Sequence, residues 1–273
     1  MGDRIVDDDL TGLGGRAVVG GAAGEPVGAE LPAAVISGGT TLMPGGGISR
    51  RPLHFIILAD CSGSMRGEKM QALNFAIAEM LPNLVAWEQE QEKAQVMVRV
   101  LTFADTPRWH IEEPVPVVGL RWRPLQHVER GRTNMGAAFR TVAEVLVPGR
   151  LEGRALQPAL LLITDGLPTD PPGQFEAGLS ALLALPAGRA AVRLAVAIGR
   201  DANSEALNRF IGDPQVPVLV ADSTDQIADR LVTASIALSR MSEVGADRDA
   251  LAAQLLQPSS GTGRELADED GIV

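Results

Sequence analysis

The stretch 53–66 reads Leu-His-Phe-Ile-Ile-Leu-Ala-Asp-Cys-Ser-Gly-Ser-Met-Arg, an apolar run followed by an acidic, serine-containing loop. Its first part, residues 53–59, is almost continuously apolar, which is typical of a strand buried on both faces of a parallel sheet. Residues 159–164 form a second such run, and an aspartate follows it as well. The two runs predict buried strands that each end at an acidic side chain, at the same edge of a sheet.

Helix-like and strand-like patterns alternate around these two runs. Further strands are expected at residues 96–103, 115–118, 192–198 and 216–220, and helices at residues 68–88, 134–146, 174–185, 203–211 and 224–240. A short helix at 246–256 is also compatible with the pattern, and Pro82 is expected to kink or interrupt its helix. The alternation predicts an α/β fold, a Rossmann-like open, mainly parallel sheet with helices on both faces.

The composition of the 273-residue chain divides it into three regions. Residues 1–50 are rich in glycine, which disfavours a packed core and predicts a flexible N-terminal arm. Residues 51–242 form the predicted domain, with a net charge of −2, and residues 243–273 form a polar, acidic tail with a net charge of −5. Most of the chain's net charge of −10 therefore lies outside the predicted domain.

The same composition disfavours several classes of protein. No window approaches the roughly 18–20 apolar residues of a membrane span, and the acidic N-terminus lacks the pattern of a secretory signal, so we expect a cytoplasmic location. The single cysteine, Cys61, excludes an internal disulfide framework and a cysteine-rich zinc site. The excess of acids argues against a nucleic-acid partner, because the phosphate backbone would be repelled.

Oxygen-bearing side chains gather where the two buried strands end. Asp60, Ser62 and Ser64 have Asp-x-Ser-x-Ser spacing directly after the first run. Asp165 follows the second run, and Thr133 lies just before a predicted helix. Ligands of open α/β sheets bind beyond the carboxyl ends of the strands. Two carboxylates and three hydroxyls suit Mg²⁺ or Mn²⁺, whereas Zn²⁺ would prefer nitrogen or sulfur ligands.

These five residues, in this order and context, resemble the metal-ion-dependent adhesion site of von Willebrand factor A domains. The resemblance covers roughly residues 52–240. It implies that the two serines and the threonine bind the metal directly and that the two aspartates often act through water. It also implies that a partner protein supplies an Asp or Glu carboxylate to the open coordination position.

Three longer stretches, residues 60–67, 131–138 and 162–170, narrow the resemblance to the TerY group. These are bacterial stand-alone A domains encoded near tellurium-resistance genes and related stress or conflict systems. The resemblance implies that a protein kinase or a PP2C-type phosphatase encoded nearby is a candidate partner. Arg132 departs from the pattern, because glycine is common at that position, and it places a cation close to the expected metal.

Motifs of catalysis are missing from the sequence. There is no P-loop and no Gly-x-Ser-x-Gly elbow, and Ser62 stands where a haloacid-dehalogenase-type phosphatase needs its second acid. We therefore expect a non-enzymatic, metal-dependent protein-binding module. The alternative is a metal-dependent phosphatase or hydrolase that uses the same site. His54 and Cys61 are interpreted as buried residues rather than as a base and a nucleophile.

Tryptophans and arginines cluster between the second predicted strand and Thr133. Because these residue types anchor many interfaces, Trp109, Trp122 and Arg132 are candidate partner-binding residues. An equal alternative is an edge strand whose arginines cover apolar surface. The acids of the C-terminal tail, or the terminal carboxylate, are a further candidate ligand for the metal.

Overall fold

The computed structural model describes residues 50–91, 93–151, 154–199, 204–243 and 245–255. These ranges contain the predicted domain of residues 51–242 except for positions 92, 152–153 and 200–203. The predicted N-terminal arm, apart from Arg50, and the predicted tail beyond residue 255 lie outside the described residues.

A six-stranded sheet organises the described residues, with the strand order β3-β2-β1-β4-β5-β6. All neighbouring strands are parallel except β2 and β3, which are antiparallel. The strands are β1 (Arg51–Asp60), β2 (Ala94–Phe103), β3 (Arg108–Pro116), β4 (Ala159–Thr164), β5 (Val192–Ile198) and β6 (Leu219–Ala221). Burial on both faces explains why β1 and β4 read as continuous apolar runs.

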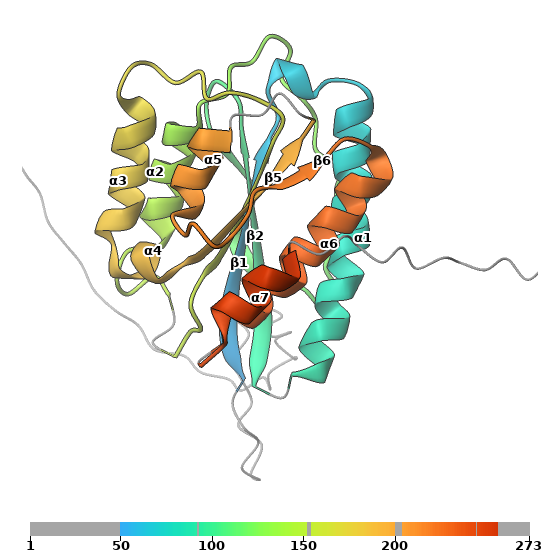
Figure 1. The fold of residues 1–273 in the computed structure, drawn as a ribbon, viewed down its shortest axis with the longest axis vertical. Helices are drawn as coiled ribbons and strands as arrows, with labels where there is room; N and C mark the ends of the chain where they lie inside the picture. Colours follow the sequence, from blue (N-terminus) through green and yellow to red (C-terminus); the bar gives the residue numbers. More distant parts are fainter. Residues whose placement is uncertain (1–49, 92, 152–153, 200–203, 244, 256–273) are drawn as a thin grey trace, which may run out of the picture. The chain divides into compact units, whose positions relative to one another are not determined.

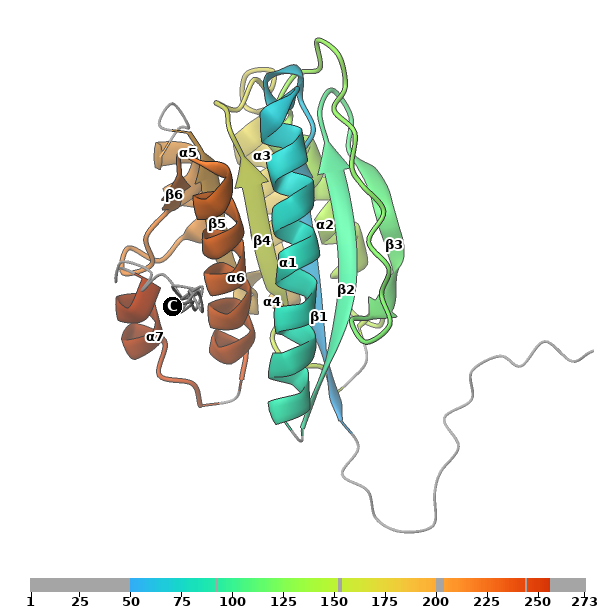
Figure 2. The ribbon, with the colours of Figure 1, turned by 90° about the vertical axis from the view of Figure 1, so that its right-hand side faces the viewer.

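Helices cover both faces of this sheet, as Figure 1 shows. One face carries α1 (Glu68–Glu90), α6 (Thr224–Met241) and α7 (Arg248–Leu255). The other carries α2 (Met135–Val145), α3 (Gln174–Ala184), α4 (Pro186–Ala190) and α5 (Ser204–Ile211). Figure 2 shows α1 and α6 side by side across the first face. The predicted α/β architecture is therefore confirmed. None of the described helices is both long enough and apolar enough to cross a membrane.

Two local predictions are wrong. The edge strand runs from Arg108 to Pro116 rather than over 115–118, because an edge strand with one open side tolerates polar residues and prolines that hide it in the sequence. The last strand is Leu219–Ala221 rather than 216–220.

Helix α1 is not interrupted at Pro82, since packing of Met80 and Leu84 against the core offsets the hydrogen bond that proline removes; a kink there stays a prediction. The helix α4 was not predicted.

A contact between two glycines joins α2 to α3. A Cβ atom on Gly178 would lie 2.0 Å from the carbonyl oxygen of Gly136, so no larger side chain fits between the two helices. Gly136 belongs to the first turn of α2. The close approach therefore fixes the start of α2, which directly follows the predicted site residue Thr133.

His54 lies within β1 and is buried, with 3% of its surface exposed. Its Nδ1 atom lies 3.2 Å from Nη1 of Arg99, which must be the donor, so the ring is neutral with its proton on Nε2. Burial, together with the Arg99 charge, lowers the pKa of His54 from 6.5 to about 4. The interpretation of His54 as a core residue is confirmed.

This histidine makes stability depend on pH. Between pH 6.5 and about 4 the unfolded chain protonates His54 and the folded chain does not, so the free energy of unfolding falls as the pH falls. We expect this loss to be about 1 kcal/mol per pH unit from His54 alone. Urea unfolding at pH 7 and pH 5 should give a loss in wild type that exceeds the loss in His54→Gln by about 1–2 kcal/mol. Equal losses in the two proteins would contradict the assignment.

Candidate metal centre

The strand order reverses between β1 and β4, and both predicted aspartates lie there. Asp60 is the last residue of β1, and Asp165 directly follows β4, its neighbour in the sheet. Crossovers leave in opposite directions at such a point, which opens a crevice at the carboxyl ends of the strands. The topology therefore brings the two acids to the place where ligands of this architecture bind.

Buried hydrogen bonds hold the carboxylate of Asp60. Its Oδ1 atom accepts the backbone N–H of Ser62 at 2.8 Å, and its Oδ2 atom accepts the hydroxyl of Thr164 at 2.6 Å. Asp60 has no exposed surface. Thr164 was not singled out in the sequence, because a threonine that ends an apolar strand carries no distinguishing signal.

The hydroxyl groups link the first strand end to the second. The Oγ atoms of Ser62 and Ser64 lie 3.0 Å apart, and the Ser64 hydroxyl donates to Oδ1 of Asp165 at 2.7 Å. A Cβ atom built on Gly166 would lie 3.5 Å from Oγ1 of Thr133 and 3.9 Å from Oγ of Ser64, so these two hydroxyls border the same small space. The structure thus brings all five predicted residues together, and we call them the oxygen cluster.

Thr133 is held in place by the loop after β4. Its N–H donates to the hydroxyl of Thr169 at 2.7 Å, and the N–H of Thr169 donates back to the carbonyl of Thr133 at 2.9 Å. The carboxylate of Asp170 accepts the first two N–H groups of α2, from Met135 at 3.0 Å and Gly136 at 2.8 Å. Asp170 thus caps a helix that begins 35 residues earlier in the sequence. Such a long-range contact leaves no signal in spacing.

Burial dominates the electrostatics of the oxygen cluster. It raises the pKa of Asp60 to about 6, although the hydrogen bonds from Thr164 and Ser62 oppose the shift and the charge of Asp165 adds to it. Burial also raises the pKa of the Cys61 thiol to about 12, which keeps this side chain protonated and unreactive. A cation beside Asp60 would stabilise its charged form.

Most of the candidate ligands in this centre are hydroxyl groups rather than the His, Cys, Asp or Glu side chains of many metal sites. Among the described residues, no group of three or more His, Cys, Asp or Glu side chains is arranged to hold a metal ion. The oxygen cluster offers two carboxylates and three hydroxyls, all of them hard oxygen donors. Such a set suits a cation that keeps several of its own waters, as Mg²⁺ does.

The three candidate partner-binding residues differ in burial and in their contacts. Trp109 and Trp122 are half-buried and pack against the core, and the Trp122 ring lies 5.4 Å from that of His110. Arg132 is exposed, and its backbone N–H donates to the carboxylate of Asp105. Within the described ranges, no hydrogen bond or ion pair joins these three side chains to the oxygen cluster. Their role in binding a partner stays a prediction.

A cavity of about 250 Å³ borders the loop that carries the serines. It is lined by Gly63, Arg66, His127, Glu129 and Arg130. Backbone hydrogen bonds tie the two loops of this cavity together, from Val128 to Cys61 and from Gly63 to Gly131. Arg130 has a φ of +56°, a left-handed conformation that is uncommon for a residue other than glycine. Two exposed arginines thus stand beside the oxygen cluster.

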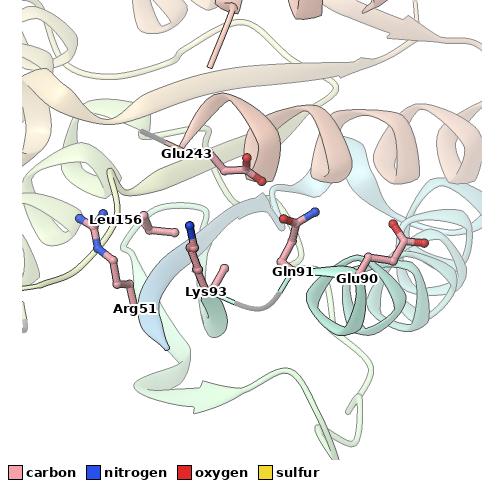
Figure 3. A pocket seen from close by; sticks show the side chains of 7 residues that line it. Arg51, Glu90, Gln91, Lys93, Leu156 and Glu243 are labelled. Carbon is pink, nitrogen blue, oxygen red and sulfur yellow. The ribbon is translucent and has the colours of Figure 1, made fainter. Parts of the chain in front are cut away.

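A larger cavity, of about 530 Å³, opens at the other end of the sheet (Figure 3). Its lining includes Arg51 at the start of β1 and Lys93 just before β2, together with Glu90 and Glu243. Charges of both signs face this cavity, and it contains none of the predicted site residues. We therefore place the candidate site at the carboxyl ends of the strands.

The family model described as "von Willebrand factor type A domain" matches residues 55–232. The chain belongs to this family. The matched range begins inside β1 and ends inside α6, so it includes the whole oxygen cluster. No curated protein matches the chain.

Solved structures share the fold of this von Willebrand factor type A domain at low sequence identity. A von Willebrand factor type A protein from Catenulispora acidiphila is 17% identical, with a TM-score of 0.52, over 70% of this chain and 43% of that one. Proximal thread matrix protein 1 from the mussel byssus, solved "with zinc occupied MIDAS motif", is 16% identical, with a TM-score of 0.53, over 70% and 48%. The pilus adhesin SpaC from Lactobacillus rhamnosus GG is 13% identical, with a TM-score of 0.53, over 70% and 31%. The chain spans less than half the length of each.

Removing the cap of α2 tests how this domain holds Thr133. Asp170→Ala leaves two helix N–H groups without their acceptor, so we expect the free energy of unfolding to fall by about 1–2 kcal/mol. Asp170→Asn keeps one acceptor oxygen and should lose less. Urea unfolding in EDTA measures both variants without any contribution from bound metal. Wild-type stability in Asp170→Ala would contradict the capping role.

Proposed function

We propose that this von Willebrand factor type A domain binds a divalent metal ion and, through it, an acidic side chain of a partner protein. Ser62, Ser64 and Thr133 would bind the ion directly, with Asp60 and Asp165 behind them. The observation that carries the proposal is the oxygen cluster itself, which joins two buried acids and three hydroxyls at the point where the strand order reverses.

The spacing of the hydroxyls supports Mg²⁺, or the similar Mn²⁺, as the ion. Adjacent ligands of an octahedral ion with bonds of about 2.1 Å lie about 3 Å apart. The Oγ atoms of Ser62 and Ser64 lie 3.0 Å apart, as two such ligands would. The zinc-occupied motif of the mussel protein is a precedent for a divalent ion in this fold. A donor set of oxygens alone favours the harder ion here.

Charge supports an acidic partner. The ion would offset the charges of Asp60 and Asp165, and in the adjacent cavity the two arginines, Arg66 and Arg130, outnumber the one acid, Glu129, which would leave this surface positive. Arg132 is exposed on the same side, next to Thr133. A positive surface around the metal attracts and orients a partner that presents Asp or Glu. Trp109 and Trp122 remain candidates for the rim of that interface.

The sequence resemblance supplies the biological setting of the proposal. We place the chain with TerY-like domains of bacterial tellurium-resistance, stress or conflict systems, and we name a kinase or a PP2C-type phosphatase as the candidate partner. The proposed role is binding in the cytoplasm rather than catalysis, with no nucleic acid and no membrane as partner. A binding role fits an oxygen cluster that contains neither a histidine base nor a reactive thiol.

Metal binding can be measured on the purified protein. We expect Mg²⁺ or Mn²⁺ to raise the melting temperature of the EDTA-treated wild type and to give a binding isotherm by calorimetry. Ser64→Ala and Thr133→Val should each weaken binding about tenfold or more, since each removes an oxygen of the cluster. Glu68→Gln, an exposed change near the same loop, is the control and should bind as wild type does. Failure of both ions to bind wild type would refute the metal site.

Partner capture tests the interface. A pull-down read by mass spectrometry should recover the partner in Mg²⁺ and lose it in EDTA. The double variant Arg66→Gln, Arg130→Asn should bind roughly three- to tenfold more weakly, because peripheral charges contribute about 1 kcal/mol or less each. Asparagine tolerates the left-handed backbone of position 130. Arg189→Gln, an exposed change in α4, is the control. Capture that is equal in Mg²⁺ and EDTA would refute a metal bridge.

A further inference from the structure

Lys69 reaches the oxygen cluster from the first turn of α1. Its ammonium group donates to Oδ2 of Asp165, while the Ser64 hydroxyl donates to Oδ1 of the same carboxylate. The Asp165 side chain is completely buried, and that of Lys69 is 44% exposed. A cation that the chain itself carries therefore enters from the surface and pairs with a buried acid of the proposed metal site.

The position of Lys69 at the start of a helix is electrostatically unfavourable unless another contact compensates for it. A positive charge in the first turn of a helix faces the positive end of the helix dipole, which is unfavourable. Within the described residues, the only ion pair of Lys69 is the one with Asp165. This pair supplies the compensation, and it also gives the buried carboxylate a positive partner, without which burial of its charge would be costly.

The residue type also matters. The chain has 24 basic residues, and only Lys69 and Lys93 are lysines. Arginine would hold a carboxylate with two parallel hydrogen bonds, whereas lysine is a single point charge on a flexible stem. A half-exposed lysine can leave the carboxylate by rotating its stem into solvent. Such an ammonium group can pair with Asp165 and can give way when a metal ion binds there.

We propose that Lys69 is a built-in counter-cation of the metal site, which neutralises Asp165 when no metal is bound and lowers the affinity for divalent ions. This inference rests on the proposed function, because it concerns the regulation of the same site. Whether the ammonium moves away or stays when the metal arrives, its charge opposes binding, either by competition for Asp165 or by repulsion. Lys69 thereby stabilises the metal-free domain and raises the concentration of free ion that is needed to load the site.

The test compares Lys69→Met with Lys93→Met. The second lysine is exposed and lies just before β2, at the opposite end of the sheet from the oxygen cluster. It lines the cavity of Figure 3. The two variants are therefore matched in residue and in change of charge. In EDTA, we expect Lys69→Met to melt at a lower temperature than wild type and Lys93→Met to melt as wild type does. In calorimetric titrations with Mg²⁺ and Mn²⁺, Lys69→Met should bind about tenfold more tightly and Lys93→Met as wild type does.

A charge-preserving variant covers the case in which Lys69→Met does not fold. Lys69→Arg keeps the positive charge with a more rigid hold on Asp165, so it should keep the metal-free melting temperature and bind the ions no more tightly than wild type. Tighter binding by Lys69→Arg than by wild type would overturn the proposal.

The outcomes separate this inference from the metal site on which it rests. If wild type binds the ions and Lys69→Met binds them equally or more weakly, Lys69 does not oppose metal binding and the proposal is overturned. An unchanged melting temperature of Lys69→Met in EDTA would overturn the neutralising role. If none of the variants, nor wild type, binds either ion, the proposed metal function fails, while the melting temperatures still report on the ion pair.

Discussion

The burial of the Asp60 carboxylate at the end of β1 is the constraint on which the rest of the site depends. An ionised group without exposed surface must find hydrogen bonds or a cation, or it becomes neutral. Ser62 and Thr164 supply two hydrogen bonds, yet the pKa of Asp60 still rises to about 6. The two hydrogen bonds therefore offset only part of the cost of burying this charge.

Rigid contacts outside the site hold the remaining oxygens near this carboxylate. The glycine contact between α2 and α3 and the cap that Asp170 provides fix the start of α2, and with it Thr133. Ser64 and Lys69 satisfy both oxygens of the second acid, Asp165. Lys69 therefore already supplies, to Asp165, part of the positive charge that a divalent ion would bring.

Sequence reasoning found the parts of the fold whose signals are local. The buried strands β1 and β4 read as apolar runs because both of their faces are covered, and the five residues of the oxygen cluster stand at their ends or at a helix start. The edge strand β3 was misplaced because its open side relaxes the requirement for apolar residues. The predicted interruption at Pro82 does not occur, because its local cost is offset by packing that only the assembled core provides.

The sequence by itself determined the alternation of strands and helices along the chain and the residue types at the strand ends. It also determined the hard-oxygen chemistry that these residue types imply. These follow from periodicity and from the chemical identity of side chains, which are properties of short segments. Only the tertiary structure decided that Asp170 caps α2, that Thr164 holds Asp60 and that Lys69 pairs with Asp165. Those contacts join residues up to 104 positions apart, so they exist only once the sheet has brought its strand ends together.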